Sequence, residues 1–360
     1  MRLWSLNSTP TFTESAIMEH HPHHILVTGG AGFIGCNFVR HLLATDSAVH
    51  IVNLDLLTYA GSLDNLNALP DPARHTFVQG DIGDRALVSR LLRDYQIDTI
   101  VHFAAESHVD RSITGPAAFV ETNLVGTFTL LEAARTAWSD GNTRERCRFH
   151  HISTDEVYGT LRRDDPPFTE TTPYAPNSPY SASKAGSDHL VRAYFHTYGL
   201  PVVTTNCSNN YGPFQHGEKF IPTVIRSCLL QKPIPVYGDG SNIRDWLYVE
   251  DHCRGIETVI RRGRLGETYN IGGCNEWANI DIVQRICALM DERHPDRAPH
   301  ERLIRFVTDR LGHDWRYAID ARKMADNLDW RPLETFDTGI AKTVDWYLQH
   351  YATDPALMKI

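Results

Sequence analysis

Short apolar runs alternate with amphipathic stretches along residues 24–206. The apolar runs have the length of buried strands, and each ends in a small or polar residue. These runs occupy 24–28, 50–55, 76–81, 99–105, 147–153 and 201–206. Stretches of helical periodicity lie between them, at 84–94, at 117–137 and around 180–184. The pattern predicts an α/β fold built on a doubly wound parallel sheet with right-handed crossovers.

The regular alternation stops after residue 206, and the later segments are shorter and more varied. They comprise extended pieces at 234–237, 268–271 and 304–307, a loop-rich stretch at 238–246, and helices from Pro222, near 280–291 and at 338–350. We therefore expect a disordered extension at 1–22 and a Rossmann-type domain at 23–206, to which some later segments return. A smaller mixed α/β substrate domain should account for most of 207–360.

Composition narrows the class of protein without identifying it. With 42% hydrophobic residues, 22% charged residues and a formal net charge of -9, the chain resembles an ordinary soluble globule rather than a nucleic-acid binder. No apolar run is long enough to span a membrane. Seven scattered cysteines without a CxxC pair fit reduced thiols in the cytoplasm better than disulfides or zinc. The histidines at 20, 21, 23 and 24 are read as incidental, and we expect no metal.

A glycine-rich loop follows the first predicted strand and precedes a helix. Gly30, Gly32 and Gly35 satisfy G-x-G-x-x-G, and Gly29, Gly32 and Gly35 satisfy a related spacing. Such a loop lets the backbone approach a pyrophosphate at a helix N-terminus. The next strand ends in Asp55, about twenty residues later, where a carboxylate binds the ribose 2′-hydroxyl and repels a 2′-phosphate. The expected cofactor is therefore NAD rather than NADP.

Other residues at the carboxyl ends of the predicted strands should line the same site. Asp81 and Ile82 end the third strand, where they can meet an adenine ring. Ala104 lies at the end of the fourth strand and Ser107 just after it, and Thr154 and Glu156 follow the fifth. Ligands of a doubly wound sheet bind at this edge.

Five side chains carry the chemistry that the sequence predicts. Tyr180 and Lys184 share one helix face, and a cation near a phenol lowers the phenol's pKa. Asp155 and Glu156 follow Thr154 directly, and two adjacent carboxylates can serve as acid and base if their surroundings separate their pKa values. The simpler interpretation is a pair of acids that stabilises a helix N-terminus.

Several longer motifs strengthen the interpretation. They are Thr28–Gly35, Leu57–Gly61, Ala104–Ser112, Ser153–Gly159, Asn206–Pro213, Arg244–Asp251 and Gly312–Tyr317. With these motifs the chain resembles the extended short-chain dehydrogenases/reductases, and more closely the dTDP-glucose 4,6-dehydratase family. The resemblance runs from about His24 to near the C-terminus. The family usually has Lys at the position of Leu56 and Pro at that of Leu311, and neither departure removes a reacting group.

The resemblance implies a hydro-lyase that converts dTDP-glucose to dTDP-4-keto-6-deoxy-glucose in deoxysugar biosynthesis, for example of dTDP-rhamnose. C4 is oxidised with Tyr180 as base, assisted by Lys184 and Thr154, and hydride passes to NAD⁺. Glu156 then removes the C5 proton, Asp155 protonates the departing C6 hydroxyl, and hydride returns to C6. NAD⁺ should be tightly bound and recycled.

The resemblance also supplies binding residues and a partner. Cofactor contacts match Gly29, Gly32, Phe33, Ile34, Gly35, Asp55, Leu56, Leu57, Thr58, Asp81, Ile82, Ala104, Ala105, Ser107, Thr122, Tyr180, Lys184 and Asn210. Substrate contacts match Ser107, Thr154, Asn209, Lys219, Phe220, Pro235, Tyr237, Arg244, Asn279, His313 and Tyr317. Arg244 offers a fork for a pyrophosphate, and Tyr237 a face for a pyrimidine. A homodimer should form through the helices at 117–137 and 180–198, whose Phe128, Leu131, Leu190 and Tyr194 exceed what one sheet face needs.

Three alternatives stay open. A nucleotide-sugar 4-epimerase would use Tyr180 and Lys184 without the acid pair. A 4,6-dehydratase could act on another nucleotide sugar such as UDP-glucose, because the sequence does not separate thymine from uracil. A non-catalytic NAD-binding sensor usually lacks the Tyr or the Lys, and both are present here.

Overall fold

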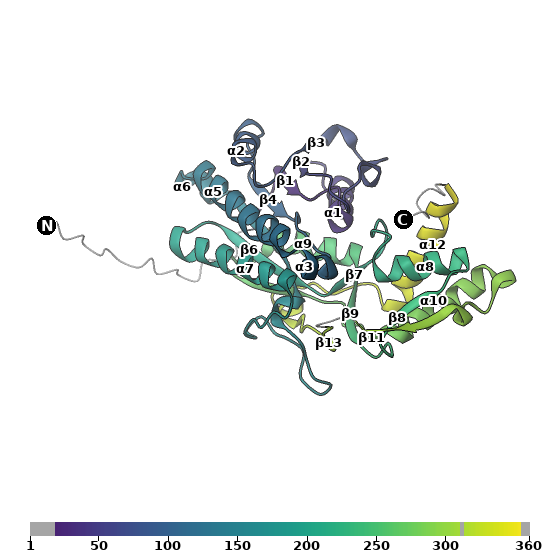
Figure 1. Cartoon of the computed structure of the whole chain (residues 1–360). Coiled ribbons are helices and arrows are strands. Elements are labelled where there is room, and N and C mark those ends of the chain that lie inside the picture. The colour runs from purple at the N-terminus through teal and green to yellow at the C-terminus, as the bar shows by residue number, and fades with distance from the viewer. Residues whose placement is uncertain (1–18, 310–312, 354–360) are drawn as a thin grey trace.

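The computed structural model describes residues 19–309 and 313–353 (Figure 1). Within them, seven strands form one parallel sheet in the order β10-β6-β5-β4-β1-β2-β3. Their bounds are β1 (His24–Thr28), β2 (His50–Asp55), β3 (His75–Gln79), β4 (Thr99–His102), β5 (Arg148–Thr154), β6 (Val202–Cys207) and β10 (Thr268–Ile271). The strand order reverses between β1 and β4, so the predicted doubly wound fold is confirmed and its ligand crevice lies there.

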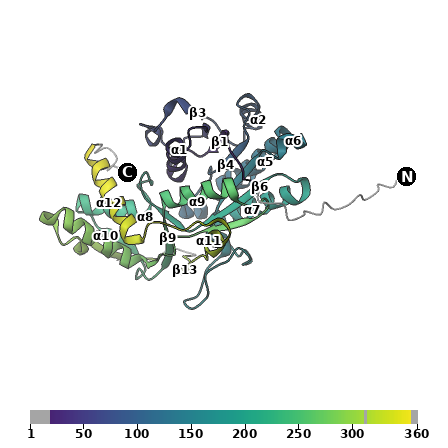
Figure 2. The same ribbon diagram turned by 180° about the vertical axis from the view of Figure 1, so that it is seen from behind.

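Helices cover both faces of this sheet, because alternate strand residues point to opposite sides. Ile25 and Val27 of β1 pack with α1 (Phe33–Thr45), α9 (Val249–Arg262) and α11 (Arg322–Leu328). Leu26 packs on the other side with α2 (Arg85–Asp94), α5 (Thr127–Ala137) and α7 (Pro179–Tyr198). Figure 2 shows α9 in front of the sheet, on the side opposite to α5 and α7.

The predicted helix at 117–137 forms as three consecutive pieces. α3 (Val109–Thr114) precedes α4 (Pro116–Phe119), a π-helix (Val120–Gly126) and α5. π-turns are rare and frequently mark functional sites. Here the wider turn puts Gly126 against Ile82, where an added Cβ would lie 2.5 Å from the Ile82 side chain. Of the apolar residues expected at a dimer interface, Leu131 and Tyr194 are instead buried within the chain, whereas Phe128 is exposed.

The second domain packs around its own core. Its elements are β7 (Asn209–Tyr211), α8 (Phe220–Leu230), β8 (Ile234–Tyr237), β9 (Ile243–Tyr248), β11 (Glu276–Ala278), α10 (Asn279–Arg293), β12 (Ile304–Val307), β13 (Arg316–Tyr317) and α12 (Phe336–Thr353). α8, α10 and α12 lie together at one end of the molecule in Figure 1. Two sequence-based expectations need correction. Residues 243–246 belong to strand β9 rather than to a loop, and 268–271 joins the large sheet beside β6 instead of the small domain.

The expectation of disorder at 1–22 is wrong for His20. Residues 1–18 lie outside the described part of the chain, but His20 is buried, and its Nε2 lies 2.8 Å from the hydroxyl of Thr99. The His20 amide also donates to the carbonyl of Arg261. Burial lowers the His20 pKa to about 3, so this histidine is a neutral packing residue of the large domain.

In the ranges that the structure covers, no helix has the length and apolarity needed to cross a bilayer.

Candidate active site

The carboxyl end of β5 presents three consecutive polar residues at the sheet edge. Thr154 ends the strand in extended conformation and caps a short 3-10 helix (Asp155–Tyr158), its hydroxyl accepting from the Glu156 amide at 3.4 Å. A threonine oxygen is a good acceptor at a helix N-terminus. The sharp change from strand to helix directs Asp155 and Glu156 in different directions, with Asp155 buried and Glu156 half-buried.

Tyr180 and Lys184 lie on the first turns of α7, next to Thr154. The helix begins with Pro179 and a capping box between Ser178 and Ser181, which fixes where its first turn starts. The Tyr180 hydroxyl hydrogen-bonds to Thr154, and the Lys184 ammonium donates to the Ile152 carbonyl at 2.9 Å. Both side chains are buried. The structure therefore brings the five predicted catalytic side chains into one group.

Asp155 carries its proton more firmly than an ordinary aspartate. Burial, followed by the charges of Glu156 and Asp245, raises its pKa well above the usual value. Its Oδ2 has no hydrogen-bond partner among the described residues although the atom is buried. A buried carboxyl whose pKa is raised and whose oxygen is unpaired is suited to donate a proton, which is the role expected of Asp155 from the sequence.

We expected the Lys184 cation to lower the Tyr180 pKa, and for the protein chain without a cofactor this expectation is wrong. Burial and the charge of Glu156 raise that pKa, although the bond to Thr154 opposes the change. The Lys184 ammonium donates a hydrogen bond to the Ile152 carbonyl, and burial lowers the Lys184 pKa. The chain alone therefore keeps this phenol protonated.

The glycine loop forms a cradle that suits a dinucleotide. Gly29 has a left-handed φ of 73°, and an added Cβ would lie 2.6 Å from the Ala104 amide nitrogen. At Gly35 the Cβ would lie 2.3 Å from the carbonyl oxygen of Gly29. Gly32 precedes α1, and its Cβ would meet only that carbonyl oxygen, at 3.3 Å. The tight packing brings the unbonded amides of the first α1 turn, which includes Phe33 and Ile34, to the sheet edge.

Asp55 links the glycine loop to the loop that follows β2. Its carboxylate accepts from the amide of Ala31 at 2.9 Å and from that of Leu57 at 2.8 Å. Two carboxylate oxygens can accept about four hydrogen bonds, so capacity remains for ribose hydroxyls. Leu57 has a left-handed φ of 57°, and Leu56 is exposed. The described residues here fit NAD.

The remaining predicted cofactor residues surround the same crevice. Asp81 is exposed and accepts from the Gly83 amide at 2.7 Å, and Ile82 is buried. The others range from half-buried to exposed, with Asn210 on strand β7 and the rest at loop or helix positions: Thr58, Ala104, Ala105, Ser107, Thr122 and Asn210. Asn210 is oriented by His252, whose Nδ1 lies 2.9 Å from its Oδ1.

The predicted substrate residues meet in pairs that join distant parts of the chain. Lys219 donates to the Ser107 carbonyl at 3.4 Å, which connects the second domain to the loop after β4. The rings of Tyr237 and His313 are 6.3 Å apart. The guanidinium of Arg244 lies 4.4 Å from the centre of the Tyr317 ring. The others are distributed over the second domain: Asn209 on β7, Phe220 and Asn279 at the starts of α8 and α10, and Pro235 on β8.

Arg244 is buried on β9 and binds backbone carbonyls of the chain. It is 5% exposed and donates to the carbonyls of Asp314 and Trp315, at 2.8 and 3.3 Å from the two amino groups. The segment that carries His313 and Tyr317 is thereby held against β9. The departure at Leu311 lies outside the described residues.

The sequence reasoning missed two buried carboxylates near the site. Asp245 follows Arg244 on β9 and accepts from the amides of Gly273 and Asn275. Asp188 lies one helical turn after Lys184 and contacts His151 and Ser153. The spacing of four residues after Lys184 was a visible signal for Asp188. Nothing local signalled that Asp245 would face Asp155. His102, His150 and His151 are buried, as expected of core residues.

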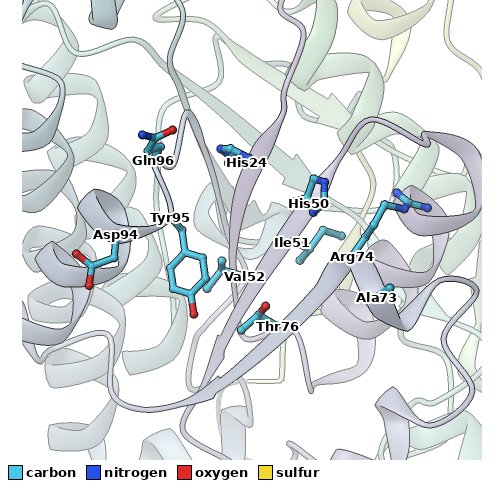
Figure 3. Close-up of a pocket in the computed structure, with 10 residues that line it drawn as sticks. All are labelled: His24, His50, Ile51, Val52, Ala73, Arg74, Thr76, Asp94, Tyr95 and Gln96. Atoms are coloured by element: carbon cyan, nitrogen blue, oxygen red, sulfur yellow. The ribbon is translucent and has the colours of Figure 1, made fainter.

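One cavity of about 320 Å³ lies away from this site (Figure 3). It is at the amino ends of β1 and β2, where His24, His50 and Arg74 line it. The Arg74 guanidinium already donates to the carbonyls of Leu43, Asp46 and Val49. No cluster suited to a metal ion occurs in the described part of the chain.

Comparisons with known proteins converge on one group. A family described as GDP-mannose 4,6 dehydratase matches residues 26–343. A dTDP-glucose 4,6-dehydratase of Xanthomonas campestris pv. campestris (strain B100) is 62% identical over 327 residues, covering 90% of this chain and 92% of the relative. A dTDP-glucose 4,6-dehydratase of Streptomyces venezuelae, solved with NAD bound, has a TM-score of 0.85 at 47% identity, covering 93% of this chain and 99% of the other. One from Bacillus anthracis, in complex with NAD, has a TM-score of 0.83 at 44% identity, with the same coverage.

Proposed function

The chain belongs to the dTDP-glucose 4,6-dehydratase family, and from this premise we propose its reaction: NAD-dependent dehydration of dTDP-glucose to dTDP-4-keto-6-deoxy-glucose. The reaction is that of a hydro-lyase in deoxysugar biosynthesis. The observation that carries it beyond the fold is the buried Asp155 carboxyl, whose Oδ2 has no hydrogen-bond partner among the described residues, beside Glu156, Thr154 and Tyr180. An epimerase has no step that needs this acid pair.

Each catalytic side chain has a task that its surroundings support. NAD, which the glycine loop and Asp55 would hold, would supply the hydride acceptor for C4 oxidation and the hydride donor for reduction at C6. Tyr180 removes the C4-hydroxyl proton, and Thr154, which already bonds the phenol, orients the C4 oxygen. Lys184 stabilises the phenolate. Glu156 takes the C5 proton, which the C4 ketone makes acidic, and Asp155 gives its proton to the leaving C6 hydroxyl.

The binding residues are proposals that rest on the same premise. Gly29, Gly32, Gly35 and Asp55 hold the dinucleotide, with the first α1 turn facing its pyrophosphate. Arg244 serves the nucleotide diphosphate of the substrate, and its closeness to Tyr317 supports that assignment. Each of the seven cysteines is a free thiol, which suits a cytoplasmic setting.

Turnover without added cofactor is the first expected result. Electrons leave and return within one cycle, so purified protein incubated with dTDP-glucose should form a 4-keto-6-deoxy sugar, detected by its alkali-induced absorbance, with no net gain of NADH. A parallel incubation with UDP-glucose reports the base preference. Stoichiometric NADH, or a 4-epimer that keeps its C6 oxygen, would contradict the proposed reaction.

A homodimer is also proposed, through the helical run at 113–128. Ile113, Val120, Val125 and Phe128 are exposed there, at 44, 45, 42 and 45%. Exposed apolar residues gathered on neighbouring turns are typical of an interface.

Phe128→Glu should weaken this dimer at least about a hundredfold, because a charge would be buried without a partner. Sedimentation at micromolar concentration should then show monomers for the variant and dimers for the wild type. Leu333→Glu is the matched control, since Leu333 is 74% exposed in a loop outside this run. A wild-type chain that sediments as a monomer would contradict the assembly.

A further inference from the structure

Behind the catalytic group, α7 is fastened to three consecutive residues of β5. The Lys184 ammonium donates to the Ile152 carbonyl at 2.9 Å. One carboxylate oxygen of Asp188 lies 3.1 Å from Nε2 of His151, and the other accepts from the Ser153 hydroxyl at 2.9 Å. The two Asp188 contacts thus flank the residue that Lys184 contacts.

Regular geometry explains why one carboxylate can do this. Residues 184 and 188 lie on one face of α7, one turn apart, and residues 151 and 153 point to the same side of β5. Ser153 immediately precedes Thr154, so the position of Asp188 affects how α7 meets the catalytic end of the strand. Asp188, His151 and Ser153 are 5, 0 and 4% exposed, so water does not compete for these contacts.

Hydrogen bonds hold the Asp188 carboxylate in its ionised form. Tyr174 contributes a third one from its hydroxyl, beside those of Ser153 and His151. Burial raises the Asp188 pKa to about 6, while the charge of Lys184, the hydrogen bonds from Ser153 and Tyr174, and the nearby His189 oppose the rise. At neutral pH Asp188 is therefore an anion inside the protein.

Lys184 is a buried cation, and a buried cation needs a negative partner. The titratable groups that influence it or are influenced by it are Asp188, Cys207, His102 and His151. Burial keeps both histidines neutral and raises the Cys207 pKa to about 12, so its thiol stays protonated. Asp188 is the anion of this set, and its charge raises the Lys184 pKa against the effect of burial.

We propose that Asp188 is a positioning residue for the reaction, which holds Lys184 as a cation and fixes α7 on β5 so that Tyr180 meets Thr154. The inference rests on the proposed function and adds a residue to it. Asp188 acts through Lys184 and the helix, and it takes no part in proton transfer to the sugar.

Asp188→Asn is the direct test, because the amide has the same shape and can still bond to His151 and Ser153. The pH at which half of the Lys184 side chains are protonated should fall by about one unit or more. This titration midpoint can be followed by ¹⁵N NMR of lysine-labelled protein, with the Lys184 signal assigned by its loss in Lys184→Arg. The kcat should fall, with KM changed less than about threefold. An unchanged Lys184 midpoint would overturn the proposal, whatever happens to the rate.

Tyr174→Phe provides a second test that does not depend on the folding of Asp188→Asn. Removing the phenol donor should raise the Asp188 pKa by about one unit, because a hydrogen bond to the charged form is lost. The carboxylate is then protonated at a higher pH, so the acid limb of the rate should shift upward from about pH 6. Tyr158→Phe is the control, because its hydroxyl shares the donor Asn206 with Tyr174 but bonds to Asn270 rather than to Asp188.

The outcomes separate this inference from the proposed function. A wild-type protein that forms no keto sugar contradicts the function itself. A wild-type protein that turns over, with the acid limb of Tyr174→Phe unmoved and equal to that of Tyr158→Phe, contradicts the role of Asp188 alone.

Discussion

Glu156→Gln and Asp155→Asn should each lower keto-sugar formation about 10²- to 10⁴-fold while C4 oxidation continues. A glutamine amide in place of the Glu156 carboxylate could not take the C5 proton. An asparagine amide in place of the Asp155 carboxyl could not protonate the leaving hydroxyl. Thr154, Tyr180 and Lys184 remain intact in both variants, so both should still oxidise C4. Rapid mixing with dTDP-glucose should therefore show NADH absorbance that persists instead of decaying.

Solvent deuterium exchange separates the two acids. Glu156→Gln should exchange the C5 hydrogen more slowly than the wild type because its base is gone. In Asp155→Asn, the C5 hydrogen should still exchange, and exchange should be fast compared with formation of the keto sugar, because Glu156 remains to remove the proton. If Glu156→Gln dehydrated the sugar at the wild-type rate, the acid–base roles of both residues would be wrong, and an epimerase-like chemistry would fit better.

The same pair predicts a pH dependence with a defined sign. The Asp155 pKa is raised by burial, by Glu156 and by Asp245, so its acid form is present below that pKa and lost as pH rises through it. In the wild type, elimination should therefore fall on the alkaline side. Asp155→Asn should lack this dependence in the elimination step measured by single turnover.

Tyr180→Phe should fail earlier, with about a 10²- to 10⁴-fold loss in C4 oxidation itself. Its ring still fills the buried position, but no oxygen remains to take the C4 proton or to bond with Thr154. NADH absorbance should not appear on mixing with substrate. Tyr158→Phe is a matched control, since it removes a buried phenol oxygen whose partners are Asn270 and Asn206. Oxidation at the wild-type rate in Tyr180→Phe would exclude this residue as the base.

Much of the fold follows from short-range patterns. Strands such as 24–28 and 50–55 form where the apolar runs predicted them, because a strand buried on both faces needs a continuous apolar run. The boundaries that failed are those set by distant partners. β10 pairs with β6 across more than sixty residues of sequence, and Arg244 is a strand residue because β9 pairs with β7, β11 and β13. Neither pairing leaves a trace in local periodicity.

The residues that react could also be recognised from short stretches of the sequence. Thr154, Asp155 and Glu156 are consecutive, and Tyr180 and Lys184 are one turn apart, so spacing alone placed each set on one short element. Protonation states could not be deduced in this way, because a pKa depends on burial and on charges from other elements. The Asp155 pKa is raised by burial, by Glu156 and by Asp245 from β9, and the Tyr180 pKa is raised rather than lowered. The sequence thus determined which groups react and on which fold, whereas the tertiary structure decided their charges and brought Asp188 and Asp245 to them.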